Sequence, residues 1–208
     1  MTNSSQVENY QAFMDRCEIY FPHDSCIKIG IVYKLAKFEH RAEVRKDEFN
    51  EDGSNVRYFE HLRRVALLLI EEVLIIDEAV VIEALLHDSI EDTRLTREEI
   101  SFVCGPEITQ GVLLMSKKPK QGFMDRLKTH ASWRELAVKC ADRIDNLRHM
   151  ENSPKEFVRK QLTETSEYYF NLSNILVDKA PLAFKKRCTV FEKLIRESWN
   201  EAEKLVLR

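Results

Sequence analysis

An apolar run near the middle of the chain ends in a cluster of ionisable side chains. The segment 84–93 reads ALLHDSIEDT, so an imidazole and three carboxylates follow three apolar residues. In a helix, residues four apart share a face, which would place Glu91 one turn beyond His87 and Asp92 one turn beyond Asp88. Leaving such groups buried and unpaired would cost on the order of several kcal/mol each. A bound metal ion is the simplest compensation.

The composition predicts an all-α fold, a bundle of helices. Among 208 residues there are only 5 Gly and 5 Pro, too few for the many tight turns of an all-β protein. With 44% hydrophobic and 32% charged residues, the chain can bury a sizeable core and is read as one domain.

The net charge bears on which partners the protein binds, and the cysteines bear on the cellular compartment in which it works. A formal net charge of −3 gives no global field that would attract nucleic acid or an anionic membrane. The five cysteines are scattered and form no CxxC pair, which argues against a disulfide framework. The polar segment Met1 to Glu8 lacks an apolar signal core, and no apolar stretch approaches the roughly 20 residues that span a bilayer. We expect a soluble cytoplasmic protein with no nucleic-acid or membrane partner; the oligomeric state is not indicated.

Hydrophobic periodicity and capping signals divide most of the chain into helices. They are expected at about 27–38, 58–73, 77–90, 96–104, 106–116, 132–150, 155–176 and 182–206. Capping boxes are expected for three pairs of residues: Thr96 with Glu99, Ser132 with Glu135, and Ser153 with Glu156. Pro154 is expected at the first helical position of the third of these helices.

Two connections carry turn-forming residues. The charged stretch between Arg45 and Tyr58 contains NEDGSN, which predicts a long loop or a small hairpin. The segment 117–122, KKPKQG, predicts an exposed loop that could lie over a site.

A second polar residue interrupts an apolar segment near residue 142. In the segment 137–144 the apolar residues share one helical stripe, and Asp142 interrupts it, with Asn146 one turn later. A carboxylate and an amide on one face suit a metal ligand with a hydrogen-bonding group beside it.

These residues resemble the HD-domain metal-dependent phosphohydrolases, and within them the alarmone hydrolase domain of the RelA/SpoT type and its small single-domain relatives. The resemblance rests on four motifs in the family's order, which are Arg45-Lys46, His61 before Val65-Ala66, the HDxxEDT block at His87–Thr93 and the ADRxxN block that ends at Asn146. It extends over roughly Ile27 to Tyr169. It implies a single HD-type domain over 1–208, with a core at about 27–176 and a C-terminal helical extension at 177–208.

The resemblance also implies a metal site and a reaction. His61, His87, Asp88 and Asp142 would bind one divalent ion, most simply Mn²⁺. Glu91 and Asp92 would then orient and deprotonate the attacking water. Arg143 would brace Asp88 or Asp142.

Nucleotide contacts are implied for three residues. Arg45 and Lys46 would hold phosphates or the base, and Asn146 would contact the sugar or a phosphate. The implied reaction is removal of the 3′-diphosphate from guanosine tetra- or pentaphosphate, (p)ppGpp, which releases pyrophosphate and GDP or GTP. The chain has no room beyond Arg208 for a synthetase domain, so a hydrolase without its own synthetase is implied.

Other interpretations stay open at this point. The enzyme could act on another nucleotide, or the protein could sense a nucleotide without hydrolysing it. His61 on its own is compatible with a capping or surface residue, and Arg45 and Lys46 with a solvated charged run. The chain also differs from the family pattern: Leu62 replaces a common proline, His149 replaces a small hydroxyl residue, and the stretch between Arg45 and His61 is longer and more acidic than usual.

Overall fold

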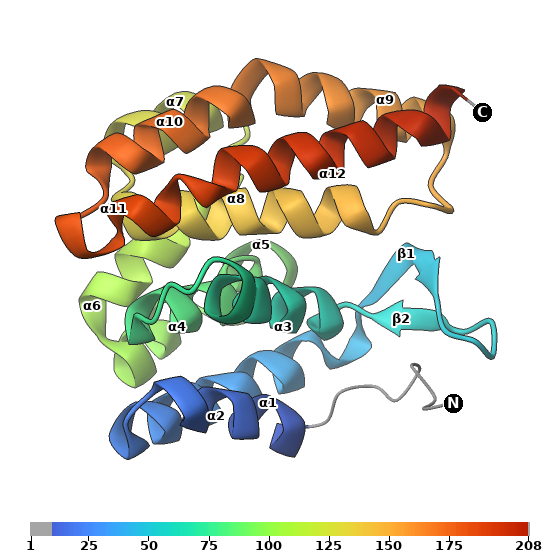
Figure 1. Ribbon diagram of the computed structural model, residues 1–208. Coiled ribbons are helices and arrows are strands. Elements are labelled where there is room, and N and C mark those ends of the chain that lie inside the picture. The colour runs from blue at the N-terminus through green and yellow to red at the C-terminus, as the bar shows by residue number, and fades with distance from the viewer. Residues whose placement is uncertain (1–9, 208) are drawn as a thin grey trace.

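The computed structural model describes residues 10–207, and helices account for most of them (Figure 1). The segment Met1 to Glu8, where the sequence shows no signal core, lies outside the described residues. In chain order the elements are α1 (Tyr10–Tyr20), α2 (His23–Glu39), a 3₁₀ turn (His40–Ala42), β1 (Val44–Phe49), β2 (Asn55–Arg57), α3 (Phe59–Leu67), a π-helical turn (Leu68–Glu72), α4 (Glu78–Leu86), α5 (Ser89–Asp92), α6 (Arg97–Met115), α7 (Phe123–His130), α8 (Trp133–Arg148), α9 (Lys155–Glu164), a second π-helical turn (Thr165–Tyr169), α10 (Phe170–Lys179), α11 (Leu182–Cys188) and α12 (Val190–Leu207). The predicted all-α fold is confirmed.

Helices α4 and α8 form the centre of the bundle. Helix α8 packs against α3, α4 and α6 on one side and against α10 and α12 on the other, so it lies between two layers (Figure 1). Their apolar residues, such as Leu85 on α4 and Ile144 on α8, are fully buried. Each such side chain contributes about 1.5–3 kcal/mol of hydrophobic stabilisation. The polar residues that these two helices also carry are therefore held in a rigid, dry setting.

The start of α8 is fixed by its first turn. Ser132 and Glu135 form the predicted capping box, in which Glu135 Oε2 accepts the Ser132 N–H at 2.6 Å. The box at Thr96 and Glu99, which begins α6, is also confirmed.

The predicted helix over 77–90 is wrong beyond Leu86. Asp77 caps α4 by accepting the Val80 N–H at 3.1 Å, and the helix ends at Leu86. His87 and Asp88 form a turn, with Asp88 at φ −104° and ψ 0°, before the short helix α5 begins. The apolar periodicity could not reveal this break, because it continues through Ile90.

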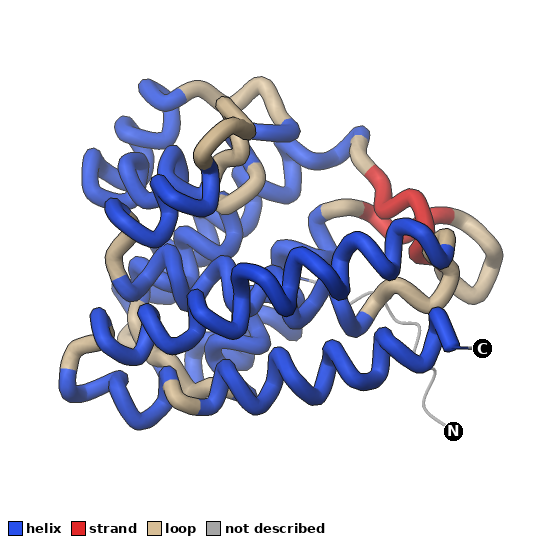
Figure 2. The backbone as a smooth tube through the Cα atoms, turned by 90° about the horizontal axis from the view of Figure 1, so that it is seen from above, coloured by secondary structure: helices blue, strands red, loops and turns tan. Residues whose placement is uncertain are grey.

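The stretch between Arg45 and Tyr58 is a small hairpin, one of the two predicted forms. Strands β1 and β2 pair antiparallel, and the hairpin projects beside the ends of the helices (Figure 2). Asn55 Nδ2 donates to the carbonyl oxygens of Arg45 at 2.9 Å and Lys46 at 3.0 Å. These bonds hold the inner part of β1 in place.

Three further expectations differ from the structure. The capping box at Ser153 is wrong: Pro154 is the N-cap residue of α9, and Ser153 Oγ donates to Asp47 Oδ2 at 3.0 Å. Helix α1 was not predicted because few apolar residues define it, although Phe13 and Cys17 are fully buried. Helix α7 was not predicted because it is only two turns long.

All five cysteines lie within the described part of the chain and are free thiols, as predicted. Over residues 10–207, every helix is too short or too polar to cross a lipid bilayer.

Gly105 interrupts α6 at the break that the sequence predicts before Pro106. Its φ of 84° and ψ of 169° belong to a region that residues with a side chain rarely adopt. We predict that Gly105→Ala lowers the free energy of unfolding by about 1–3 kcal/mol, measured by chemical denaturation. Gln110→Ala, at an exposed position of the same helix, should change it by less than about 0.5 kcal/mol. Equal stabilities for the two variants would contradict this account.

Candidate active site

Four predicted metal ligands converge from three segments of the chain. His61 lies on α3, His87 and Asp88 lie in the turn after α4, and Asp142 lies on α8. His61 Nε2 is 3.2 Å from Asp142 Oδ1 and 3.9 Å from Asp88 Oδ2. His87 Nε2 is 3.0 Å from Asp88 Oδ2 and 3.8 Å from Asp142 Oδ1. All four residues are buried.

Hydrogen bonds on the far side of each imidazole fix its orientation. His87 Nδ1 lies 2.8 Å from the carbonyl oxygen of Ala84, which can only accept, so Nδ1 carries the proton. His61 Nδ1 lies 2.7 Å from the carboxylate of Asp145. Both Nε2 atoms are then left with a lone pair, and both are buried without a hydrogen bond. Two buried lone pairs that face two carboxylate oxygens require a positive charge between them.

Asp145 is itself held by Arg64. The Arg64 guanidinium donates to Asp145 at 2.8 and 3.1 Å and to Glu48 of the hairpin at 2.7 and 3.0 Å. Burial would raise the pKa of Asp145, but the hydrogen bond with His61 and the charge and hydrogen bonds of Arg64 outweigh it and lower the pKa. Asp145 therefore stays ionised and keeps the ring of His61 in one orientation.

The two candidate carboxylate ligands have neighbours of their own. The ammonium group of Lys139, a fully buried residue, contacts Asp142 Oδ2 and leaves Oδ1 facing the histidines. Tyr58 donates its hydroxyl proton to Asp88 Oδ2 at 2.7 Å. Burial, followed by the charge of Asp88, raises the pKa of Tyr58, so the phenol remains a donor.

The donor set fits a divalent cation. The ligand atoms of His61, His87 and Asp88 lie within 4.8 Å of one another. The distances above place Asp142 Oδ1 beside the same imidazoles. Two imidazole nitrogens with two carboxylate oxygens suit borderline or hard cations such as Mn²⁺, whereas thiolate-preferring metals are not favoured. The described residues thus contain a site that could hold one such ion.

A cavity of about 620 Å³ opens beside these residues, within the size range of ligand pockets. Its polar lining includes Arg45, Lys46, Asp88, Glu91, Asp92, Lys117, Asp142, Asn146 and His149. Its apolar lining includes Met150, Pro154 and Phe157.

Glu91 and Asp92 both line this cavity, on α5. Partial burial and the negative charges of Asp88, Glu91 and Glu43 raise the pKa of Asp92. Glu91 Oε2 accepts the backbone N–H of Lys117 at 3.0 Å, which ties the loop 117–122 to the cavity wall. A carboxylate with a raised pKa beside a metal-ligand cluster can accept a proton during a reaction.

The predicted nucleotide-binding residues lie on the same cavity. Arg45 Nη2 donates to Asn146 Oδ1 at 2.8 Å, and Asn146 Nδ2 donates to Asp142 Oδ1 at 2.5 Å. Lys46 is exposed at the cavity wall. The structure therefore brings together every residue that the sequence singled out for metal, catalysis or nucleotide.

The expected role of Arg143 is wrong. Its guanidinium contacts Gln161 and lies 3.3 Å from Glu164, and it stacks over the Tyr169 ring at 4.3 Å. Lys139 takes the place beside Asp142 instead.

The sequence did not reveal Asp145, Lys139 or Tyr58 as parts of the site. Asp145 and Lys139 carry one detectable signal, since both are charged residues three positions from Asp142 on a helix whose neighbouring residues are apolar. Tyr58 precedes α3 in a polar stretch, where nothing in the local pattern distinguishes it.

Sequence comparisons place this arrangement in a known family. The profile of the HD domain matches residues 42–176, which contain all four candidate ligands. The chain belongs to the HD domain family. The chain is 30% identical over 152 residues to the guanosine-3′,5′-bis(diphosphate) 3′-pyrophosphohydrolase of Drosophila melanogaster, and the match covers 70% of this chain and 80% of that enzyme.

Longer bacterial proteins share the same region. The bifunctional (p)ppGpp synthase/hydrolase SpoT of Escherichia coli K12 is 27% identical over 179 residues, which cover 80% of this chain and 24% of that protein. A GTP pyrophosphokinase of Brucella melitensis is 30% identical over 172 residues, which cover 77% and 22%. This HD domain thus spans about a quarter of the length of these two relatives.

A solved structure shares the fold of this HD domain. It is described as a metazoan SpoT ortholog that hydrolyses ppGpp, and it aligns with a TM-score of 0.63 and 26% identity. The alignment covers 87% of this chain and 97% of the solved one.

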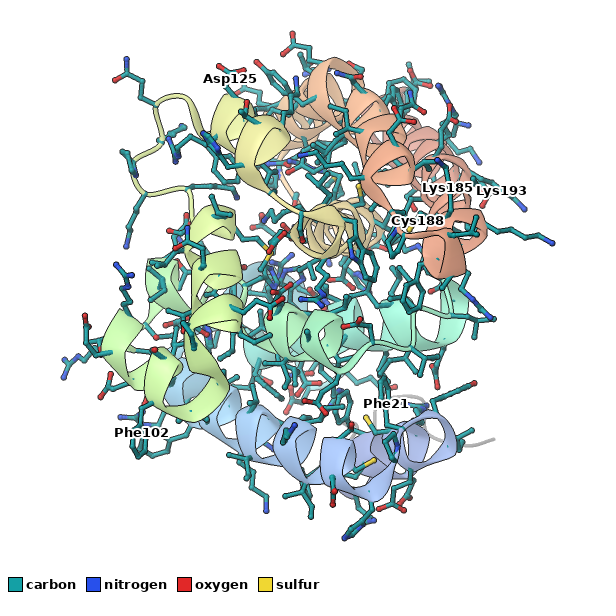
Figure 3. The ribbon with its side chains drawn as sticks, turned by 90° about the vertical axis from the view of Figure 1, so that its left-hand side faces the viewer. Phe21, Phe102, Asp125, Lys185, Cys188 and Lys193 are labelled. Carbon is teal, nitrogen blue, oxygen red and sulfur yellow. The ribbon has the colours of Figure 1, made fainter. Side chains whose placement is uncertain are left out.

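We predict that Asp145→Asn weakens manganese binding by roughly 10- to 100-fold, because the ring of His61 loses its charged partner. Isothermal titration with Mn²⁺ measures the affinity. Asp125→Asn is the matched control, since Asp125 is exposed on α7 (Figure 3) and does not line the cavity. Unchanged affinity in Asp145→Asn would show that this carboxylate does not orient His61.

Proposed function

We propose that this protein is a metal-dependent phosphohydrolase that removes the 3′-diphosphate from guanosine tetra- or pentaphosphate, releasing pyrophosphate and GDP or GTP. One observation carries the proposal: two buried imidazole lone pairs and two carboxylate oxygens meet beside a nucleotide-sized cavity that holds both acidic and basic side chains. The substrate follows from the activity named for the relative that this chain covers to four-fifths of its length. The reaction would be performed by the whole chain acting as one HD domain, with the C-terminal helices packed on α8.

His61, His87, Asp88 and Asp142 would hold the metal ion, which we take to be Mn²⁺. When bound, such an ion lowers the pKa of a coordinated water and offsets negative charge on phosphate oxygens. The protein fixes the two imidazole ligand atoms in advance through the hydrogen bonds on the far side of each ring, and it holds the two carboxylates through Tyr58 and Lys139, so little reorganisation is needed.

Asp92 would accept the proton of the attacking water. Its pKa is raised and therefore lies closer to neutral pH than the pKa of an ordinary aspartate, which suits a general base. Glu91 would orient the same water, while its bond to the Lys117 N–H keeps its carboxylate in place.

Arg45, Lys46 and Asn146 would bind the nucleotide. Arg45 and Lys46 offer positive charge to phosphates from β1, and the guanidinium of Arg45 can donate two parallel hydrogen bonds to one phosphate. Asn146 bonds to both Arg45 and Asp142, so it lies between the phosphate-binding side chain and the metal site. Met150 and Phe157 give the cavity apolar surface suited to a base.

The free thiols of all five cysteines fit a protein that works in a reducing cytoplasm.

Manganese-loaded protein should release pyrophosphate from guanosine tetraphosphate, detected with a coupled phosphate assay. Asp92→Asn should lower kcat by roughly 10²- to 10⁴-fold with an unchanged metal content, because the base is lost while the ligands remain. His87→Ala should instead lower the bound metal per chain in elemental analysis. Full metal loading without turnover would refute guanosine tetraphosphate as the substrate. A panel of deoxynucleotides and dinucleotide phosphates would then identify which other nucleotide the phosphohydrolase cleaves. Unchanged turnover in Asp92→Asn and Glu91→Gln would refute their catalytic roles.

Arg45→Ala should raise KM by roughly 10- to 100-fold, the loss expected for hydrogen bonds to a charged group, while kcat falls less. Steady-state kinetics separates the two parameters. Arg41→Ala removes a nearby exposed cation that does not line the cavity and should leave KM unchanged. If both variants behave alike, Arg45 does not bind the substrate.

A further inference from the structure

Glu83 is a buried acid that the proposed reaction does not use. It lies on α4, one turn before His87, and only 1% of its surface is exposed. Both of its carboxylate oxygens are buried without a hydrogen-bond partner. An ionised carboxylate in this setting would be strongly destabilising.

A second carboxyl group faces it across Gly111. A Cβ atom on Gly111 would stand 2.5 Å from Glu83 Oε1 and 2.8 Å from Glu135 Oε1, so α6 approaches closely only because this residue has no side chain. Glu135 is also buried, and its other oxygen, Oε2, is committed to the Ser132 N–H. The capping box therefore aims Oε1 of Glu135 towards Glu83. Two acceptor-only carboxylates in this position cannot satisfy each other.

The surrounding charges do not neutralise the pair. Arg134, on α8, is the neighbouring cation, but it is bound to Glu107 of α6 at 2.5 Å and lies 3.7 Å from Asp77. Asp77 and Glu107 add negative charge near Glu83. Helices α2 and α3 also pack against α4. Among the charged groups of these two helices, Lys28 is bound to Glu78 and Arg63 is bound to Glu60.

We propose that the pair of Glu83 and Glu135 retains one proton in the folded protein at neutral pH, so that neutral Glu83 donates a hydrogen bond towards Glu135 and ties α4 to α8 over Gly111. Burial, together with the charge of Glu135, raises the pKa of Glu83 to about 9, which agrees with this assignment. A neutral carboxyl also explains how Glu83 tolerates full burial.

The pair is placed to position the metal site. Glu83 is one turn from His87 on α4, and Glu135 is two turns from Asp142 on α8. Loss of the shared proton puts two negative charges between α4, which leads directly into the turn with His87 and Asp88, and α8, which carries Asp142. Glu83 is thus a positioning residue, and this part of the inference rests on the proposed metal site.

The sign of the pH dependence follows from linkage. Glu83 has a higher pKa in the folded chain than in the unfolded chain, where 4.5 is the ordinary value. Its contribution to stability is complete below that ordinary value, decreases as the pH rises from about 4.5, and is lost by about pH 9. A glutamine at position 83 keeps a neutral donor at every pH.

The test compares melting temperatures of the full chain between pH 5 and pH 9.5, without metal and with Mn²⁺. Glu83→Gln should melt within about 1 °C of the wild type at pH 5 and about 5 °C or more above it at pH 8.5. Glu98→Gln, which removes an exposed charge on α6, should follow the wild-type curve at every pH. The proposal that the pair retains a proton would be overturned by a difference in melting temperature that stays constant with pH. A Glu83→Gln variant that is less stable than the wild type at every pH would overturn it as well.

Manganese titration at pH 7 and pH 9 tests the positioning role. The ratio of the wild-type Kd to the Kd of Glu83→Gln should increase at least severalfold from pH 7 to pH 9, because only the wild type gains a negative charge between α4 and α8. A ratio that stays constant would overturn the positioning role. If no variant binds manganese, the proposed function and the positioning role both fail, while the metal-free melting curves still decide whether the proton is retained.

Discussion

The site depends on where two protons are placed. His61 and His87 each hold a proton on Nδ1, one against the carboxylate of Asp145 and one against the Ala84 carbonyl. That choice directs both Nε2 lone pairs into one buried space, where two aspartates already stand. Such a set is unfavourable on its own, because it concentrates electron density away from water. The surrounding bundle therefore has to be stable enough to hold the two imidazoles and the two aspartates together when no cation is bound.

Helix α8 supplies both the packing and the polar side chains of the site, on different faces. Its apolar residues form the middle of the core between α3 and α4 on one side and α10 and α12 on the other. On the remaining face it carries Lys139, Asp142, Asp145 and Asn146. Asp142 lies three residues from Lys139 and from Asp145 and four from Asn146, so the four side chains share one face of the helix. Lys139 and Asn146 both bond Asp142, while Asp145 bonds Arg64 and Asn146 also bonds Arg45. Through Arg64 and Arg45 these residues link the candidate metal site to the hairpin.

The sequence predicts the site better than its supporting contacts. His87, Asp88 and Asp142 stand out because a carboxylate or imidazole in an apolar run has few explanations other than a ligand or a buried pair. The full set of candidate ligands, with His61, was implied only by the resemblance to the HD-domain hydrolases. The end of α4 at Leu86 could not be predicted, since the apolar period continues to Ile90 and only the turn at Asp88 interrupts it. Asp145 and Lys139 were missed because their partners, His61 and Asp142, are set by the packing of α3 on α8 or by side-chain direction, neither of which a linear pattern encodes. Arg143 was misassigned for the same reason: it points towards Gln161 on α9.

The hairpin has an inner half beside the candidate site and an outer half that stands apart from it. The inner half of β1 carries Arg45 and is held by Asn55 and, through Glu48, by Arg64. The outer half ends in a turn closed by short bonds among Asn50, Asp52 and Ser54, and it extends away from the helices (Figures 1 and 2). Extra residues between the two strands therefore add length at an exposed tip while the root keeps its register. This tip is the natural attachment point for a fluorescent label or an affinity handle, because it shares the hairpin with Arg45 and Lys46, which line the cavity, without lining the cavity itself.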